Sequence, residues 1–277
     1  MDYIEIDFKI IPLEQGSDIL IAQLSELGFE SFVNTDEGVQ AYIPASLFDE
    51  KQLKNLPILN DKHLFKITYN TKQIPAQNWN ALWESNFEPV LIANRCYVRA
   101  PFHPSNTNYE FELIIEPKMS FGTAHHETTS LVIQLMLEMD IKNKTLLDMG
   151  CGTGILAILA YKKGATNIVA IDNDEWAFEN TKENIERNNS VIETILGDAK
   201  LIENLKFDII LANINRNILL NDISTYAKSL NEKGTLIMSG FYEADLPIIK
   251  ETSELKGLFY QKHLVNNNWV AVYFTKK

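Results

Sequence analysis

The segment Thr145–Leu159, TLLDMGCGTGILAIL, constrains this chain of 277 residues more than any other. An apolar run ends at Asp148, alternate glycines follow at Gly150, Gly152 and Gly154, and a second apolar run begins without a helix breaker. The pattern predicts a buried strand, a tight loop and the first turns of a helix. Glycines in such a loop permit positive φ and let a ligand approach the backbone, and the free N–H groups of the helix face the same crevice.

The spacing of these glycines separates two kinds of nucleotide site. A dinucleotide fingerprint, G-x-G-x-x-G, would place a glycine at position 155, where this chain has Ile155. Asp148 would also repel a pyrophosphate but attract a cationic or zwitterionic ligand. D-x-G-x-G-x-G at a strand-to-helix turn resembles motif I of the class I S-adenosylmethionine-dependent methyltransferases, whose ligand carries a sulfonium and an ammonium. The alternative is a glycine-rich connection that binds no ligand.

Length and composition limit the remaining possibilities. The chain is long enough for one large domain with or without a small one, and its apolar content of 45% is normal for a globular core. A net charge of −12 argues against generic nucleic-acid binding. Cys96 and Cys151 show no metal-ligand or CxxC spacing, as expected of reduced thiols. With no signal peptide and no apolar stretch near the ~20 residues that span a bilayer, we expect a soluble cytoplasmic protein without a membrane partner.

Residues 1–72 are predicted to form a small α+β domain. Alternating apolar positions indicate strands, and apolar positions at helical spacing indicate helices. The expected order is strand Tyr3–Ile11, helix Ser17–Leu27, strands Ser31–Thr35 and Val39–Ile43, helix Phe48–Leu56 and strand His63–Tyr69. This split βαβ pattern is ferredoxin-like. The domain contains no catalytic constellation, so we expect it to recognise a partner; a structural appendage is the alternative.

Residues 73–89 are predicted to be a helical linker between two domains. Trp79, Trp83 and Phe87 recur every four residues and would share one face of a short helix. Pro75 and Pro89 bracket that helix. Packing against a core is the preferred role of the aromatic side chains.

Residues 90–277 begin with two apolar runs and a dense polar loop. The runs are Val90–Val98 and Tyr109–Ile115, and the loop Glu116–Thr129 (EPKMSFGTAHHETT) precedes a helix predicted at Ser130–Met139. Ligand contacts usually lie in loops. Adjacent histidines such as His125 and His126 rarely bind one metal together, and no third ligand follows at helical spacing, so no metal site is predicted.

After the glycine loop, strand and helix patterns alternate. Strands are expected at Asn167–Ile171, Val191–Leu196, Phe207–Ala212, Gly234–Ser239, Phe259–Val265 and Trp269–Phe274, and helices at Glu175–Asn188, Ile218–Leu230 and Glu243–Leu255. With the strand before the glycines, they predict an α/β, doubly wound, mostly parallel seven-stranded sheet that ends in an antiparallel hairpin and binds its ligand at the carboxyl ends of the strands.

Two acids follow the second strand of this sheet. Asp172 lies 24 residues after Asp148 and can accept hydrogen bonds from both hydroxyls of a ribose. Asp174 is predicted to be only the N-cap of the next helix.

Several segments together resemble one family, PrmA. They are the aromatic stretch ahead of FEP, the loop FGTAHHETT, LLDMGCGTGILAI, AIDNDEWAFENTKENIERN and LANI. The resemblance covers Trp79 to Gly240 well and the first domain only in length and pattern. It implies an S-adenosylmethionine-dependent methyltransferase that trimethylates lysine side chains and the N-terminal α-amino group of the large-subunit ribosomal stalk-base protein, number eleven, with the first domain gripping that substrate. Residues matching Thr129, Gly150, Asp172 and Asn213 would bind the cofactor.

The expected roles follow from this resemblance and from the chemistry of the ligand. Asn213 would orient the acceptor amine, and the backbone of Gly150 and Gly152 with Asp148 would hold the methionine moiety. Thr129 would close over that moiety. By the general pattern of the class, Asp198 would meet the adenine amine. Methyl transfer from a sulfonium needs orientation and a neutral amine, so His125 and His126 are expected to position the loop and not to act as bases.

The sequence departs from the common family motifs at two places. The usual loop FGTGTHPTT differs at Ala124, His125 and Glu127, and Ala124 lacks the freedom of a glycine to adopt positive φ. NINR replaces NILA, so Asn215 and Arg216 stand where apolar residues are usual. Arg216 would bring a cation near the substrate ammonium.

Three other functions remain as alternatives. A methyltransferase acting on a glutamine amide would carry NPPY at the fourth strand, where this chain has Asn213-Ile214-Asn215-Arg216. A non-catalytic ribosome-binding module would bind no S-adenosylmethionine. A nicotinamide oxidoreductase is disfavoured by Ile155.

Overall fold

The structure is a computed structural model that describes residues 2–75, 87–118 and 120–277. The chain divides into two compact units, Met1–Asn86 and Phe87–Lys277, and each is described by itself. Among the described residues, no helix has the length and apolar character needed to cross a bilayer.

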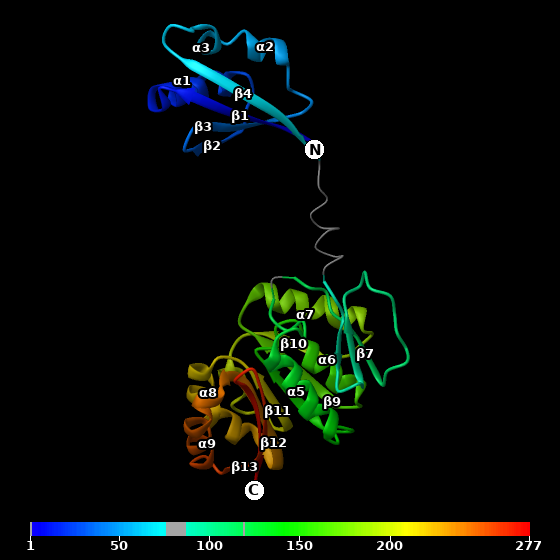
Figure 1. Cartoon of the computed structure of the whole chain (residues 1–277). Coiled ribbons are helices and arrows are strands. Elements are labelled where there is room, and N and C mark those ends of the chain that lie inside the picture. Colours follow the sequence, from blue (N-terminus) through cyan, green and yellow to red (C-terminus); the bar gives the residue numbers. More distant parts are fainter. Residues whose placement is uncertain (1, 76–86, 119) are drawn as a thin grey trace. The chain divides into compact units, whose positions relative to one another are not determined.

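The first unit is a four-stranded antiparallel sheet with helices. Its elements are β1 (Tyr3–Ile11), α1 (Leu13–Glu26), β2 (Ser31–Thr35), β3 (Gly38–Pro44), α2 (Glu50–Lys54), α3 (Pro57–Asn60) and β4 (Lys66–Ile74). The strand order is β2-β3-β1-β4, with every neighbouring pair antiparallel. This order confirms the predicted ferredoxin-like arrangement (Figure 1). Alternate residues of β1, such as Ile6 and Phe8, are buried with Leu20 and Leu24 of α1.

Several elements of this unit differ from prediction, most of all the starts of the first helix and the last strand; α2 is shorter than Phe48–Leu56, and α3 was not predicted. The helix begins at Leu13, directly after Pro12, and not at Ser17. The last strand begins at Lys66, because the carboxylate of Asp61 accepts hydrogen bonds from the amides of His63 and Leu64 and holds these residues in a turn. Residues 76–86 of the predicted helical linker, with Trp79 and Trp83, lie outside the described residues. The linker helix and the domain boundaries at residues 72 and 90 therefore stay predictions.

The second unit contains the predicted seven-stranded sheet (Figure 1). Its strands are β8 (Thr145–Met149), β9 (Thr166–Asp172), β10 (Glu193–Leu196), β11 (Phe207–Asn213), β12 (Leu230–Tyr242), β13 (Leu258–Asn266) and β14 (Trp269–Lys276). The order is β10-β9-β8-β11-β12-β14-β13. The first five strands in that order are parallel, and β14 pairs antiparallel with both β12 and β13.

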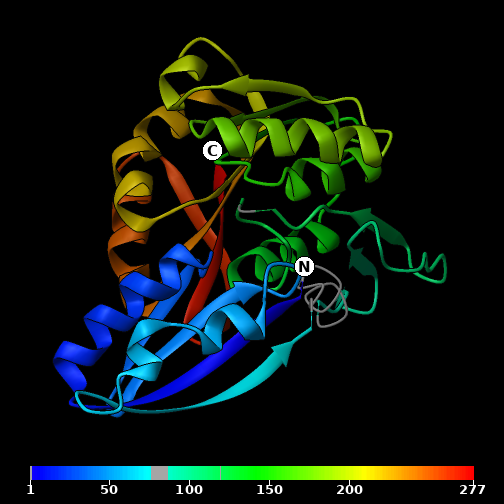
Figure 2. The same ribbon diagram turned by 90° about the horizontal axis from the view of Figure 1, so that it is seen from above.

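Helices cover both faces of this sheet, which confirms the doubly wound arrangement. They are α5 (Glu127–Glu138), α6 (Ile155–Lys162) and α7 (Glu175–Arg187) on one face, and α8 (Arg216–Ser229) and α9 (Leu246–Glu254) on the other (Figure 2). Successive side chains of a strand point to opposite faces. Leu146 therefore belongs to the core beneath α5 and α6, and Leu147 to the core beneath α8 and α9.

A small three-stranded sheet precedes α5 and was not predicted as such. It consists of β5 (Val90–Ile92), β6 (Cys96–Arg99) and β7 (Phe111–Ile114). The apolar run Val90–Val98 folds back on itself because Ala93 and Asn94 adopt left-handed conformations, with φ of 49° and 53°. An ion pair between Arg99 and Glu112, 2.9 Å long, links the parallel strands β6 and β7.

Candidate functional site

The candidate site lies where the strand order of the large sheet changes direction. From β8 the chain continues outward to β9 and β10 on one side, whereas β11, the other neighbour of β8, leads to β12. Ligands of open α/β sheets bind at the carboxyl ends of strands at such a switch point. Asp172 ends β9, Asn213 ends β11, Asp198 follows β10, and Asp148 lies one residue before the end of β8.

The glycine loop between β8 and α6 has the backbone conformation expected from its sequence. Gly150, Gly152 and Gly154 have φ of 70°, 57° and 76°, values that an L side chain rarely adopts. Neighbouring atoms of the chain also leave little space for a side chain at each glycine. An added Cβ would lie 2.2 Å from Ile214 Cγ2 at Gly150, 2.2 Å from the carbonyl oxygen of Phe121 at Gly152, and 2.9 Å from a Thr181 methyl at Gly154. Packing against backbone thus excludes a side chain at Gly152, whereas at Gly150 and Gly154 a neighbouring side chain would have to shift.

Asp148 is a buried carboxylate beneath this loop. It is 1% exposed, and its Oδ2 accepts a hydrogen bond from the Ala157 amide at 3.1 Å. Burial raises the pKa of Asp148 to about 7; the Ala157 amide opposes the rise and the negative charge of Asp172 adds to it. Its Oδ1 has no hydrogen-bond partner among the described residues. A buried, unpaired carboxylate oxygen favours a cationic ligand nearby, which fits a sulfonium- and ammonium-bearing cofactor.

Asp172 ends β9, and Asp198 follows the neighbouring strand β10 at the same edge of the sheet. Asp172 Oδ2 accepts from the Gly152 amide at 2.9 Å, and its Oδ1 accepts from the Asp174 amide at 3.0 Å. Each carboxylate oxygen retains a further lone pair for a hydroxyl donor. The Gly197 amide donates to the carbonyl of Asp172 at 2.8 Å and so brings Asp198 alongside. The carboxylate of Asp198 accepts from the Lys200 amide at 3.0 Å.

Asp174 caps α7, as predicted. Its Oδ1 accepts hydrogen bonds from the amides of Trp176 and Ala177, at 2.7 and 3.3 Å.

Thr129 and Asn213 are joined by a hydrogen bond at the carboxyl edge of the sheet. Asn213 Nδ2 donates a hydrogen bond to Thr129 Oγ1 at 3.3 Å. Thr129 is 1% exposed. Asn213 Oδ1 is buried without a hydrogen-bond partner in the described parts of the chain. The structure thus brings together two predicted site residues from separate motifs, and one of them presents an unused acceptor.

The helix that carries Thr129 starts earlier than predicted. α5 begins at Glu127, so Thr129 belongs to its first turn and not to the preceding loop. His126 is the N-cap, and its Nδ1 accepts a hydrogen bond from the Thr128 amide at 3.3 Å. The expected start at Ser130 was wrong because an N-cap histidine is not among the usual N-terminal signals.

The two adjacent histidines have separate packing roles. His125 places Nε2 2.9 Å from the carbonyl oxygen of Glu88 and Nδ1 3.1 Å from Thr123 Oγ1. The His126 ring contacts Phe121 and Trp269, with centroids 5.0 and 4.8 Å away. In residues 2–75, 87–118 and 120–277, no three His, Cys, Asp or Glu side chains form a group that could hold a metal ion.

The two departures from the family motifs have structural counterparts. Ala124 adopts the left-handed conformation of the glycine it replaces, with φ of 71°, while 1% exposed. Arg216 Nη1 forms an ion pair with Asp245 Oδ1 at 2.6 Å, and its guanidinium also donates to Asn217 Oδ1. The loop backbone is therefore kept, and the added cation is neutralised locally.

Sequence reasoning missed two buried residues of this site, Thr153 and Asn184. Each is 0% exposed and hydrogen-bonds the backbone of a different segment. Asn180 and Asn184 on α7 and Asn188 at its C-cap recur at four-residue spacing, and this repeat was the one available signal.

Comparisons with known proteins agree on one family. The family model for ribosomal protein L11 methyltransferase (PrmA) matches residues 16–277. A ribosomal protein L11 methyltransferase of Phocaeicola vulgatus is 46% identical and covers 100% of both chains, and that of Porphyromonas gingivalis is 45% identical over 99% of this chain and 98% of its own.

Comparison with solved structures also identifies a ribosomal protein L11 methylase. The structure of a ribosomal protein L11 methylase from Lactobacillus delbrueckii has a TM-score of 0.63 and 27% identity, covering 69% of this chain and 100% of its own. The fold alone is shared with a methyltransferase of Pyrococcus furiosus, at a TM-score of 0.52 and 22% identity over 59% of this chain and 89% of the other. The chain therefore belongs to the PrmA family of ribosomal protein L11 methyltransferases, which are class I S-adenosylmethionine-dependent enzymes.

Proposed function

We propose that this enzyme transfers methyl groups from S-adenosylmethionine to amino nitrogens of ribosomal protein L11, in the cytoplasm where ribosomes assemble. The acceptors are lysine side chains and the N-terminal α-amino group, and each is trimethylated. The proposal is supported by the family match over residues 16–277 and by the polar groups at the carboxyl edge of the sheet.

One observation carries the proposal from family to chemistry: Asn213 Oδ1 is a buried acceptor without a partner, in a side chain whose Nδ2 is held by Thr129. An amine with a free N–H, the acceptor in the first two of the three transfers, can donate to this oxygen, and Thr129 fixes which way the amide points. Asn213 would orient the lone pair of the acceptor nitrogen along the line of methyl transfer.

The remaining predicted residues would hold the cofactor. S-adenosylmethionine, when bound, supplies a methyl group made electrophilic by a positively charged sulfur. Asp172 would accept hydrogen bonds from the ribose hydroxyls, and Asp198 would accept one from the adenine amine. The backbone at Gly150 and Gly152 and the Asp148 carboxylate would surround the methionine moiety, and Thr129 would cover it.

The acceptor amine must lose a proton before it can attack. Lysine titrates near 10.4 in water, so fewer than about one amine in a thousand is neutral at pH 7. A partly desolvated site beside a sulfonium favours the neutral form. Water can carry the proton away, and His125 is a poor base because both of its ring nitrogens already have partners.

The first unit would recognise the protein substrate. It contains the four-stranded sheet described above, and we assign it no part in the chemistry. Residues 73–89 would act as the joint that lets one recognition domain present several amines to one methyl-transfer site.

An amide acceptor is the main rival within the same class. Amide methylation is favoured by two prolines that shape a planar slot, and Asn213 is followed here by Ile214 and Asn215. A module that only binds ribosomes would not account for the buried, unpaired oxygens of Asp148 and Asn213, which favour a ligand bound at this edge.

The test is a transfer assay with the full-length chain. Labelled S-adenosylmethionine is incubated with the enzyme and total ribosomal proteins from cells that lack its gene, and the labelled protein is identified by mass spectrometry. We expect label on L11, at lysine and α-amino nitrogens, and no label with Asn213→Ala. Label on a glutamine amide, on another protein or on none would overturn the proposal.

A further inference from the structure

Thr153 ties the glycine loop to the segment that precedes α5. It is 0% exposed, its amide donates to the carbonyl of Phe121 at 2.9 Å, and its Oγ1 donates to the carbonyl of Gly122 at 2.5 Å. One residue therefore satisfies two successive carbonyls of another segment. Because the hydroxyl is fully buried, no water can replace it without a rearrangement.

Asn184 of α7 ties Thr153 in turn to the end of the small sheet. Its Nδ2 donates to the carbonyl of Thr153 at 3.0 Å, and its Oδ1 accepts from the Glu116 amide at 2.9 Å. Asn184 is also 0% exposed. Thr153 and Asn184, here called the Thr153–Asn184 clamp, thus join the glycine loop, helix α7, Glu116 and the residues Phe121–Gly122 through four hydrogen bonds.

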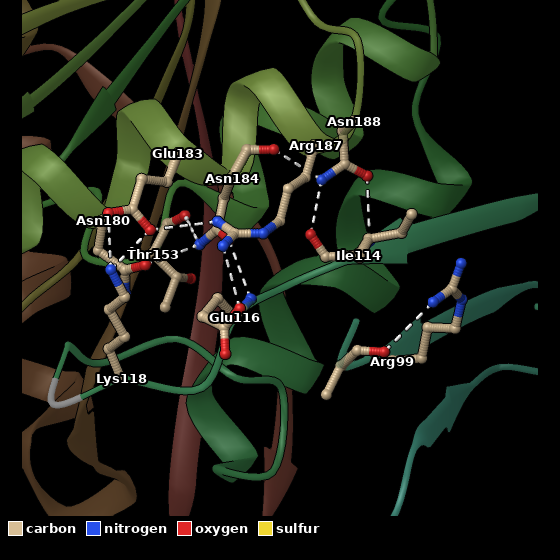
Figure 3. A network of polar contacts seen from close by, with 11 residues as sticks. Arg99, Ile114, Glu116, Lys118, Thr153, Asn180, Glu183, Asn184, Arg187 and Asn188 are labelled. Atoms are coloured by element: carbon tan, nitrogen blue, oxygen red, sulfur yellow. Dashed lines mark hydrogen bonds and ion pairs between the residues drawn. The ribbon is translucent and has the colours of Figure 1, made fainter. Parts of the chain in front are cut away.

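The neighbouring residues of α7 reinforce this arrangement (Figure 3). Asn188 accepts from the Ile114 amide at 3.0 Å and donates to the Ile114 carbonyl at 2.7 Å, so its side chain pairs with β7 as a neighbouring strand would. Arg187 forms an ion pair with Glu116 at 3.1 Å, and Glu183 forms one with Lys118 at 2.6 Å. Helix α7 therefore fixes the chain that leads into the site.

The residues held by the clamp lie against the glycine loop of the candidate site. The carbonyl of Phe121 lies directly against Gly152, where a Cβ would be only 2.2 Å away. The Phe121 ring is 51% exposed and contacts His126, the N-cap of the helix that carries Thr129. The backbone of Phe121 is thus held by Thr153, while its half-exposed ring rests on His126.

We propose that Thr153 and Asn184 are positioning residues for the methyl acceptor. They hold Phe121 and Gly122 beside His126, the N-cap of the helix whose Thr129 binds Asn213, while their own side chains are buried. The inference rests on the proposed function and deepens it, because it assigns acceptor capture to two residues outside the predicted cofactor set. A misplacement of about 1 Å in such a segment is enough to lower kcat/KM for a protein substrate about a hundredfold.

The central test compares two variants of Thr153, one with valine and one with serine. Thr153→Val keeps the shape and the backbone N–H but removes the hydroxyl from the Gly122 carbonyl, whereas Thr153→Ser keeps the hydroxyl. We expect Thr153→Val to raise the KM for L11 by about tenfold to a hundredfold, with kcat and the Kd of S-adenosylmethionine within about threefold of wild type. Thr153→Ser is expected to restore the KM. Asn184→Leu is expected to act in the same direction as Thr153→Val.

Ser229→Ala is the matched control for loss of stability. Ser229 is 1% exposed and donates from Oγ to the carbonyl of Ile202 at 2.8 Å, so the control also removes a buried hydroxyl–carbonyl bond. It directly precedes β12, at the opposite edge of the parallel strands from Asn213. We expect a similar loss of Tm in Ser229→Ala and Thr153→Val, with wild-type KM in the former. A wild-type KM in Thr153→Val, an equal KM increase in Ser229→Ala, or no restoration by serine would overturn the proposal.

Hydrogen exchange gives a readout that needs no turnover. In Thr153→Val we expect faster exchange of the residue-153 amide, which donates to the Phe121 carbonyl, and in Asn184→Leu faster exchange of the Glu116 amide, with wild-type rates in Ser229→Ala. Unchanged exchange in both clamp variants would refute the clamp itself. If wild-type enzyme fails to methylate L11, the proposed function fails, while the exchange data still decide whether the clamp holds the segment.

Discussion

Asn213 Nδ2 donates a hydrogen bond to Thr129 Oγ1 over 3.3 Å, joining the end of β11 to the first turn of α5 across 84 residues of sequence. This contact unites two motifs, FGTAHHETT and LANI, that are separate in the sequence. It leaves Asn213 Oδ1 as the free end of the amide. The orientation of that amide therefore depends on a side chain of a different element.

Removal of the Thr129 hydroxyl tests this dependence. We expect Thr129→Val to weaken S-adenosylmethionine binding by about fivefold to tenfold, since a net hydrogen bond contributes about 1 kcal/mol, and to lower kcat because the Asn213 amide can then rotate. Thr129→Ser keeps the hydroxyl and should behave as wild type. Calorimetry and steady-state kinetics on the three proteins decide the matter; equal behaviour of the valine and serine variants would contradict it.

Asp172 offers a second test at the cofactor side. Asp172→Asn keeps one acceptor oxygen but removes the charge, so we expect the Kd of S-adenosylmethionine to rise by about tenfold to 150-fold, equivalent to about 1.5–3 kcal/mol for a charged hydrogen bond. Asp174→Ala is the control. It removes the N-cap of α7 and should lower stability by about 1 kcal/mol without changing the Kd. A Kd that moves equally in both variants would assign Asp172 a structural role only.

The raised pKa of Asp148 predicts that the free energy of unfolding depends on pH. Burial raises the pKa of Asp148 from 3.8 to about 7 in the folded chain, so the folded state binds this proton more readily than the unfolded state between those values. By linkage, the contribution of Asp148 to the free energy of unfolding rises as pH falls through about 7 and is fully recovered near pH 4.

The neutral isostere Asp148→Asn isolates this contribution. We expect it to stabilise the cofactor-free protein at pH 8 and to have a smaller effect at pH 5, when both are measured by urea unfolding. An identical difference between variant and wild type at the two pH values would show that the carboxyl does not titrate in this range.

The ion pair between Arg216 and Asp245 neutralises a cation near Asn213, so its loss is expected to weaken binding of the cationic acceptor. Asp245→Asn leaves the Arg216 guanidinium unneutralised next to the loop that follows Asn213. We expect the KM for L11 to rise about twofold to fivefold at low salt, and the effect to disappear at about 0.5 M salt because Arg216 is exposed and screened. The double variant Asp245→Asn, Arg216→Gln should restore the KM; a KM that stays high in the double variant would contradict the electrostatic explanation.

Much of the fold follows from local patterns in the sequence. The alternation of β1, the glycine loop after β8 and the Asp174 cap depend on residues close in the chain, and the structure confirms them. The hairpin inside Val90–Val98 was missed because Ala93 and Asn94 reach left-handed conformations without a glycine.

Local sequence patterns could place a candidate side chain at the carboxyl edge of the sheet only where a strand ends. Asp172 and Asn213 have that placement, whereas Thr153 and Asn184 act through backbone groups of segments distant in sequence. No periodicity reports which carbonyl a buried side chain will meet, so such contacts emerge only from the folded structure.

The packing of the glycine loop has a consequence for how this motif tolerates mutation. Side chains added at Gly150, Gly152 and Gly154 would collide with three different segments, at Ile214, Phe121 and Thr181. An alanine scan of the motif would therefore lower thermal stability even in the absence of any cofactor. The presence of all three glycines in a homologue therefore indicates a folded domain and does not by itself indicate catalytic activity.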